Sequence, residues 1–251
     1  MNRLILATGS NSGYLTKINA YLTSIELKSN FDLNFLIYLG DNELKLPFEK
    51  IKIVNVFEKD LEILPINYCI QHGEFVKSKI FNDLTNDNDV IFFTDGDIEI
   101  QRNLTEEEIE RFKNFNDNDV YVGYNASPTD TLYAESLRLG IIDEKSNLLK
   151  HNLKSIKVYN TGVLAMNKKT WLKLMNQFIE YYPEVNNTFS HYAKQQWLLS
   201  FLINTKGYNV QEMSYEIHNH KHFPSPIGTR QDSNGLVYFN EKMVLFKHKW
   251  D

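Results

Sequence analysis

The sequence has little of what marks an extracellular or membrane protein. Its 251 residues include one cysteine, Cys69, so no disulfide can form within the chain and nothing indicates a cysteine-based zinc site. The apolar run at residues 4–7 is much too short for a signal-peptide core or a membrane span. We therefore expect a cytoplasmic protein without a transmembrane segment.

The sequence also lacks a cluster of basic residues. The formal net charge is −5, and the 27 basic residues are dispersed along the chain, which argues against nucleic acid as a partner. Hydrophobic residues make up 42% and charged residues 24%, the usual values for soluble globular proteins. Because no repeat, low-complexity tract or linker is present, we expect residues 1–251 to form a single domain.

Short apolar segments that alternate with amphipathic ones predict an α/β fold. Strands are expected at residues 4–7, 35–39, 51–56, 90–94, 120–124 and 163–166. Helices are expected from Tyr14, at residues 72–84 and 105–112, and around Trp171 and Trp197. This order predicts a Rossmann-like α/β/α sandwich with a central mixed, mostly parallel sheet.

The most informative strand, residues 90–94, leads directly into Asp95-Gly96-Asp97. Residues i and i+2 of an extended segment point the same way, so the two carboxylates should lie side by side. Gly96 leaves the backbone open to close approach. Two oxygen ligands suit Mn²⁺ or Mg²⁺ that keeps open positions for diphosphate oxygens. A ligand-free Asp-Gly-Asp turn is the alternative, but the apolar run places the pair at a sheet edge where α/β proteins bind ligands.

Four segments carry motifs in a fixed order along almost the whole chain. They are residues 90–98 (VIFFTDGDI), 159–167 (YNTGVLAMN) with Trp171 after them, 195–200 (QQWLLS), and the closing 246–250 (FKHKW). Together they resemble GT-A fold glycosyltransferases, in particular the glycogenin and lipopolysaccharide galactosyltransferase group, family 8. The resemblance implies transfer of a hexose from a nucleotide diphosphate sugar, with UDP-sugar favoured, to a glycan, lipid-linked or protein acceptor.

The resemblance also implies a metal site. Asp97 would ligate Mn²⁺ or Mg²⁺ directly, and Asp95 would bind the metal or the ribose of the donor. The third ligand of this group is a C-terminal histidine, for which we select His248, because Mn²⁺ accepts imidazole. His220 and His222 remain alternatives for that role.

Further positions are implied to surround the donor. They would hold the base, ribose or diphosphate, or let the backbone approach them: Thr8, Gly9, Tyr14, Lys79, Asp95, Gly96, Gly162, Lys247 and Lys249. The ring of Tyr14 is available to stack on uracil, with a role in the helix core as the alternative. Lys79 would face the nucleotide, although an exposed lysine needs no function.

The predicted catalytic residues are Asp97, Asn160 and Gln196, and the two amides would face the transferred sugar. Residues 185–211 contain no Asp or Glu, whereas an inverting transferase needs a general base near the acceptor hydroxyl. Retention of configuration is therefore expected, with the departing phosphate accepting the proton. Alternative bases are His191, Asp130 and Glu135.

The acceptor is expected to be set by the insertion at residues 125–158, where Tyr133, Leu137 and Leu139 predict a short helix over the site. A haloacid dehalogenase-type phosphatase also places Asp-any-Asp after an apolar strand, but on its first strand. A sugar nucleotidylyltransferase is a further alternative, although its glycine-rich opening with a basic residue is missing from residues 8–13. A carbohydrate-binding domain without catalysis would show a broken metal pair.

Overall fold

The computed structural model describes residues 2–40, 42–56, 79–124, 131–138, 150–188, 194–221 and 226–249. Several residues named above lie outside these ranges: Cys69, Asp130, Leu139, His191 and His222. The expected helix at 72–84 is described only from Lys79 onward.

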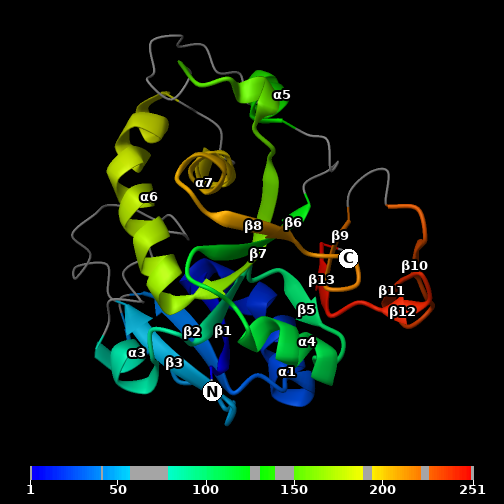
Figure 1. The fold of residues 1–251 in the computed structure, drawn as a ribbon. Coiled ribbons are helices and arrows are strands. Elements are labelled where there is room, and N and C mark those ends of the chain that lie inside the picture. The colour runs from blue at the N-terminus through cyan, green and yellow to red at the C-terminus, as the bar shows by residue number, and fades with distance from the viewer. Residues whose placement is uncertain are drawn as a thin grey trace.

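A seven-stranded sheet with the order β3-β2-β1-β4-β7-β6-β8 forms the centre of the fold (Figure 1). Its strands are β1 (Leu4–Asn11), β2 (Leu33–Leu39), β3 (Ile51–Val56), β4 (Val90–Thr94), β6 (Asp119–Tyr124), β7 (Tyr159–Asn167) and β8 (Asn209–Glu212). Only β7 runs antiparallel to its neighbours, while the pairings among the other strands are parallel. The expected mixed, mostly parallel sheet is confirmed.

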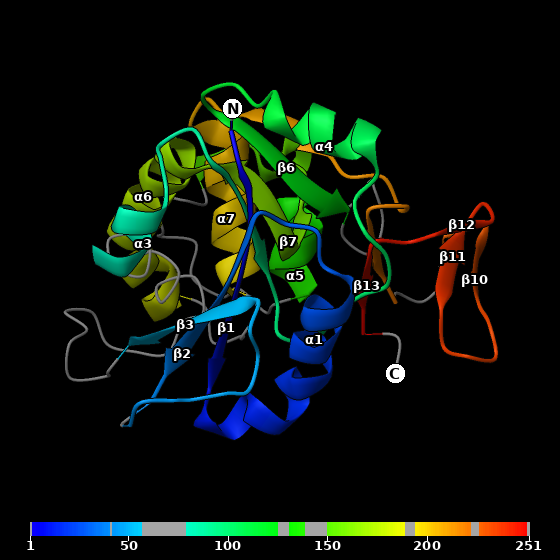
Figure 2. The same cartoon turned by 90° about the horizontal axis from the view of Figure 1, so that it is seen from below.

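Helices cover both faces of this sheet (Figure 2). One face carries α1 (Leu15–Lys28) and α4 (Glu106–Lys113), and the other carries α3 (Lys79–Leu84), α6 (Lys168–Thr188) and α7 (Lys194–Thr205). Side chains of β1 alternate between the two resulting cores, since Leu6 packs in the cluster of Ile18 and Ile5 in that of Trp171. The sequence therefore builds the expected α/β/α sandwich.

Two strands are longer than the sequence predicts, β1 at its end and β7 at its start. β1 continues past residue 7 to Asn11, because residues 8–11 keep pairing with residues 36–39 of β2. β7 begins at Tyr159 rather than 163, and its register with β6 shifts between Val122 and Gly123. This irregularity lies beside Gly162, which the site uses.

The C-terminal part folds back as two small sheets that the sequence did not predict. One has the order β5-β13-β9, and the other, β10-β11-β12, projects from the body in both views (Figures 1 and 2). Their strands are β5 (Ile98–Ile100), β9 (His218–His220), β10 (Thr229–Gln231), β11 (Val237–Phe239), β12 (Lys242–Met243) and β13 (Phe246–His248). Strand β13 pairs with β5 and so returns the end of the chain to the segment after β4.

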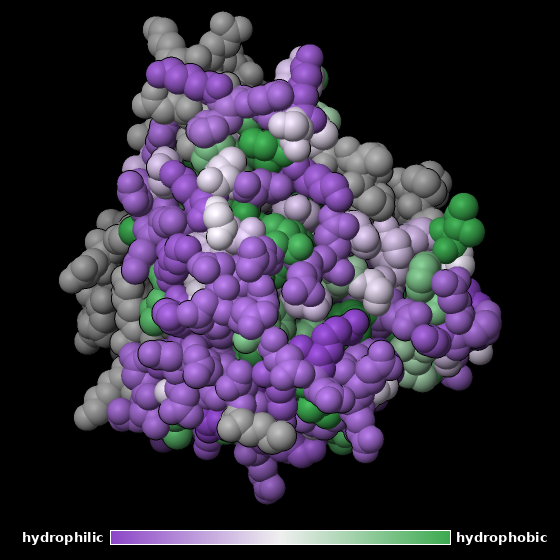
Figure 3. All heavy atoms as spheres, in the orientation of Figure 1, coloured by the Kyte–Doolittle hydropathy of each residue, from purple (hydrophilic) through white to green (hydrophobic). Residues whose placement is uncertain are grey.

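The insertion contains α5 (Leu132–Arg138) and the 3₁₀ turn η4 (Leu153–Ser155). The helix expected around Tyr133 and Leu137 is thus confirmed. Trp197 Nε1 donates to Ser136 Oγ at 3.0 Å and ties α5 to α7. Among the described helices, none has the length and apolar character to cross a membrane. The face seen in Figure 3 is mostly hydrophilic, with hydrophobic residues in small separate groups.

Candidate active site

Two aspartates and a histidine meet at the end of β4. Asp95 follows β4, Asp97 precedes β5, and His248 ends β13. His248 Nε2 lies 3.1 Å from Asp97 Oδ1 and 3.7 Å from Asp95 Oδ2. One ligand atom from each residue falls within 4.8 Å of the others, as a shared metal ion requires. Within the part of the chain that the structure describes, no other such group is found.

The environment of His248 fits a metal ligand. Its side chain is 1% exposed, and among the described residues its Nε2 has no partner in hydrogen-bonding geometry. A buried polar atom without a partner is rare in folded proteins, and a cation between Nε2 and the carboxylates would satisfy it. A Cβ on Gly162 would lie 2.2 Å from Cε1 of His248, so only glycine permits this approach.

The electrostatics of the two aspartates differ. Burial raises the pKa of Asp95 to about 6, and the nearby Asp97 adds to the rise while His248 and Lys249 oppose it. For Asp97 burial also acts upward, but the neighbouring His248 and then Lys249 lower its pKa below the ordinary value. Holding both carboxylates ionised thus costs free energy, which a divalent cation would offset.

A buried hydroxyl network fixes the end of β4. Thr8 Oγ1 donates to Thr94 O at 3.0 Å, and Thr94 Oγ1 donates to Ala7 O at 3.3 Å. The Tyr21 hydroxyl lies 2.5 Å from Thr94 Oγ1 and donates to it. The side chain of Thr8 is therefore fully buried and its hydroxyl fastens β1 to β4, while the expected place of Thr8 beside the donor stays a prediction.

Two glycines that the sequence predicts beside the donor are neighbours at the same edge. A Cβ on Gly96 would lie 3.4 Å from Gly9 O, so these two glycines are neighbours. Tyr14 is 52% exposed in the 3₁₀ turn η1 (Ser12–Tyr14), which excludes the helix-core alternative and leaves its ring accessible. Lys79 begins α3, and its donor contact stays a prediction.

The two lysines that flank His248 have different surroundings. Lys247 Nζ lies 2.8 Å from Glu99 Oε2 and is almost buried, on the opposite side of β13 from His248. Its charge is thus paired with Glu99 here, and its expected contact with a diphosphate stays a prediction. Lys249 Nζ lies 3.7 Å from Asp97 Oδ2, and its side chain is 53% exposed.

The predicted sugar-facing residues lie on neighbouring elements. Asn160 is buried, and its Oδ1 accepts from Gly162 N at 2.8 Å. Gln196 lies in the first turn of α7. Ser200 of the same helix accepts a hydrogen bond from Tyr159 N at 3.0 Å through its Oγ, and this contact holds α7 beside Asn160. Their contacts with a sugar remain predictions.

The structure also narrows the alternatives that the sequence left open. Glu135 is buried and accepts from Nε and Nη2 of Arg138, so it is not available as a base. His220 packs edge-on against His248 with 4.3 Å between ring centres and is not in the metal group. His218, which the sequence did not single out, lies with its Nε2 3.1 Å from His248 Nδ1. No local pattern reveals it, since the contact joins residues 30 positions apart.

Comparison with known proteins identifies the fold. Two solved structures of the galactosyltransferase LgtC, one with donor and acceptor sugar analogues and one with an active-site glutamine changed to glutamate, match this chain. Each match covers 97% of this chain and 86% of the other, with a TM-score of 0.56 and 16% identity. No protein-family model matches the sequence, and no curated protein matches it significantly. The chain therefore has the GT-A glycosyltransferase fold.

Proposed function

We propose that this protein is a metal-dependent glycosyltransferase that moves a hexose from a nucleotide diphosphate sugar, with UDP-sugar favoured, to a glycan, lipid-linked or protein acceptor. The observation that carries the proposal is the cluster of Asp95, Asp97 and His248 at the edge of a GT-A sheet. LgtC, which shares this fold, is a galactosyltransferase solved with donor and acceptor sugar analogues. We further propose that residues 1–251 act as one domain in the cytoplasm.

Each part of the donor has a candidate partner in the chain. Asp95, Asp97 and His248 would hold Mn²⁺ or Mg²⁺, which supplies charge neutralisation at the leaving diphosphate. Lys249 is exposed beside Asp97 and adds a positive charge for the same oxygens. The ring of Tyr14, exposed after β1, would stack on the base.

We propose that the reaction retains configuration. The first turn of α7 carries no acid, and the next acid, Glu212, pairs with Lys157 at 2.8 Å. With Glu135 held by Arg138, the departing phosphate is the best acceptor for the proton of the incoming hydroxyl. Asn160 and Gln196 would position the sugar, and the active-site glutamine of LgtC supports a glutamine in this role.

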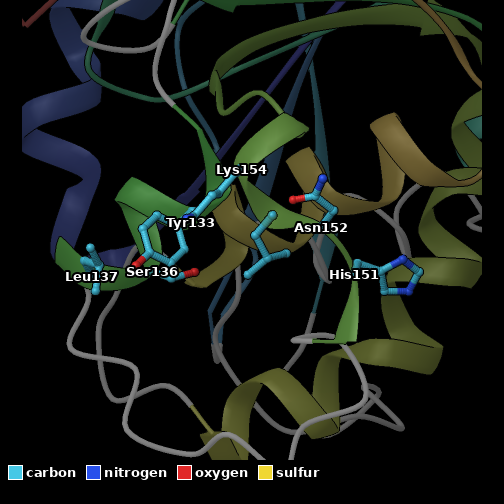
Figure 4. A pocket seen from close by; sticks show the side chains of 7 residues that line it. Tyr133, Ser136, Leu137, His151, Asn152 and Lys154 are labelled. Atoms are coloured by element: carbon cyan, nitrogen blue, oxygen red, sulfur yellow. The ribbon is translucent and has the colours of Figure 1, made fainter.

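The acceptor is proposed to meet the insertion. A cavity of about 340 Å³ lies between α5 and η4, lined by Tyr133, Ser136, Leu137, His151, Asn152, Leu153 and Lys154 (Figure 4). The Lys154 ammonium lies 4.9 Å from the centre of the Tyr133 ring. Because Ser136 is bonded to Trp197, the cavity is coupled to the turn of α7 that carries Gln196.

The two alternative enzyme classes, a phosphatase and a nucleotidylyltransferase, differ from the proposed one in strand order or in reaction. In a haloacid dehalogenase-type phosphatase the aspartate pair follows the first strand, whereas β1, β2 and β3 precede β4 here. A sugar nucleotidylyltransferase shares the overall fold but would join a sugar phosphate to a nucleotide. The products of the reaction therefore separate the three activities.

The test is hydrolysis of a panel of nucleotide sugars by purified protein with Mn²⁺ or with EDTA. We expect cation-dependent release of a nucleoside diphosphate from one donor, its loss in Asp97→Ala, and its persistence in Asp83→Ala, which removes an exposed acid on α3. Hydrolysis of a generic phosphate ester with no turnover of any donor would reject the proposal and favour the phosphatase.

A further inference from the structure

Three histidine rings gather behind the two aspartates. His218 and His220 come from β9 and His248 from β13, and the register of these parallel strands sets His248 opposite His220. His218 Nε2 lies 3.1 Å from His248 Nδ1, and the two rings stack with 5.3 Å between centres and 26° between planes. His218 thus reaches the ring of His248 from the side opposite to the nitrogen that faces the aspartates.

The chemistry of imidazole restricts the proton in this pair. A neutral ring carries its proton on one nitrogen, and a nitrogen that binds a metal must carry none. His248 Nε2 faces the carboxylates, so the metal-binding form of His248 carries its proton on Nδ1. Nδ1–H then donates to His218 Nε2, which accepts only when the proton of His218 is on Nδ1.

Two glycines confine the rings in this arrangement. A Cβ on Gly123 of β6 would lie 2.2 Å from His218 Nδ1, and one on Gly162 of β7 would lie 2.2 Å from His248 Cε1. Both rings are almost fully buried, with His218 4% and His248 1% exposed. Water therefore cannot readily replace the acceptor that His218 offers.

We propose that His218 is a positioning residue that fixes the tautomer and orientation of His248, so that the lone pair of Nε2 faces Asp95 and Asp97. The proposal rests on the metal site of the proposed function. Residues that accept the second N–H of a ligating histidine raise metal affinity by about 10- to 100-fold. Without this acceptor, His248 can carry its proton on Nε2 and donate to Asp97 Oδ1, 3.1 Å away, which blocks the metal-binding nitrogen.

Two variants separate hydrogen bonding from packing. His218→Phe keeps a ring of similar shape but removes the acceptor, whereas His218→Gln offers a carbonyl oxygen near the position of Nε2. Mn²⁺ affinity is measured without any nucleotide sugar, by electron paramagnetic resonance of free Mn²⁺. We expect about 10- to 100-fold weaker binding for the Phe variant and near-wild-type binding for the Gln variant.

A second readout does not depend on metal. In metal-free protein with ¹⁵N-labelled histidine, the ring shifts of His248 should show the proton on Nδ1 in the wild type and on Nε2 in His218→Phe. Equal Mn²⁺ affinity in the wild type and the Phe variant, or equal weakening in Phe and Gln, would overturn the proposal. Because no donor is used, a negative transferase assay changes neither outcome. Wild-type protein that binds no Mn²⁺ would reject this proposal and the proposed function together.

Discussion

At the residue scale, Asp95 should destabilise the metal-free protein at neutral pH. Its pKa is raised by burial from 3.8 to about 6, so its contribution to stability is present at low pH and is lost as pH rises from about 4 through 6. Asp95→Asn removes this loss. In EDTA, the free energy of unfolding of the variant relative to the wild type should rise between pH 4 and pH 7 and then level off. The rise should be on the order of 1–2 kcal/mol. This value is smaller than the full pKa shift implies, because about a third of the Asp95 side chain is exposed and solvent screens its charge.

Urea unfolding of both proteins at pH 4, 5.5, 7 and 8 provides the measurement. Glu110→Gln, which removes an exposed acid on α4, is the matched control. A flat or falling difference for Asp95→Asn would show that burial does not raise the pKa of this carboxyl. The same variant should bind Mn²⁺ weakly, because a neutral amide oxygen replaces a charged carboxylate beside the ion.

The sequence predicts some site residues better than others for a physical reason. Asp95 and Asp97 form a local pattern, since two acids follow an apolar strand, and His248 was selected through the resemblance. The polar contacts that Thr8 and Lys247 make could not be predicted, because their partners, Thr94 and Glu99, lie far away in the chain. A residue type alone does not tell whether its polar group is already paired.

At the element scale, the end of β13 at His248 separates the roles of the two flanking lysines, because Lys247 lies within the strand and Lys249 follows it with a φ of 54°. Lys249→Ala should raise the KM for the nucleotide sugar about 3- to 10-fold, because a charge beside the diphosphate is lost. Lys247→Ala should leave this KM unchanged and lower the free energy of unfolding by at most about 1 kcal/mol, since Glu99 stays partly hydrated. Steady-state kinetics with the preferred donor and urea unfolding test both variants. A larger KM effect for Lys247→Ala would reverse the assignment.

Helix α5 supports a prediction about acceptor recognition. Tyr133→Ala removes the ring that lines the cavity of Figure 4 and should raise the KM for the acceptor about tenfold. Hydrolysis of the donor without acceptor should not change. Leu27→Ala, which removes a 72% exposed side chain from α1, should alter neither value. A Tyr133→Ala enzyme with normal acceptor KM would place acceptor binding elsewhere.

Whether a strand could be predicted from the sequence depends on its length. Strands β3 and β4 match their expected bounds because five or six residues with a strong apolar character suffice to identify a buried strand. Strands β5 and β9 to β13 have two or three residues each, which is too short for an alternating pattern. Their pairing depends on contacts between distant segments, and so the sheet that positions His248 could not be predicted.

At the scale of the whole molecule, the proposed metal site joins the C-terminal strand to the segment that follows β4. Strand β13 pairs with β5, and Lys247 and Glu99 in this pairing are 148 residues apart. The cation would add a second connection at the same point, between His248 and the aspartates after β4. Metal binding should therefore stabilise the fold as a whole.

The size of this stabilisation follows from mass action. At a Mn²⁺ concentration about 100-fold above its Kd, a ligand that binds only the folded state contributes about 2.7 kcal/mol. For a chain of this length, each kcal/mol corresponds to about 2–4 °C in Tm, so differential scanning calorimetry should show a rise of about 5–10 °C that EDTA reverses. Asp97→Ala should show no rise, because the ion loses the ligand nearest His248. An equal rise in Asp97→Ala would mean that Mn²⁺ binds elsewhere, and no rise in the wild type would mean that the Asp95, Asp97 and His248 cluster does not hold this ion.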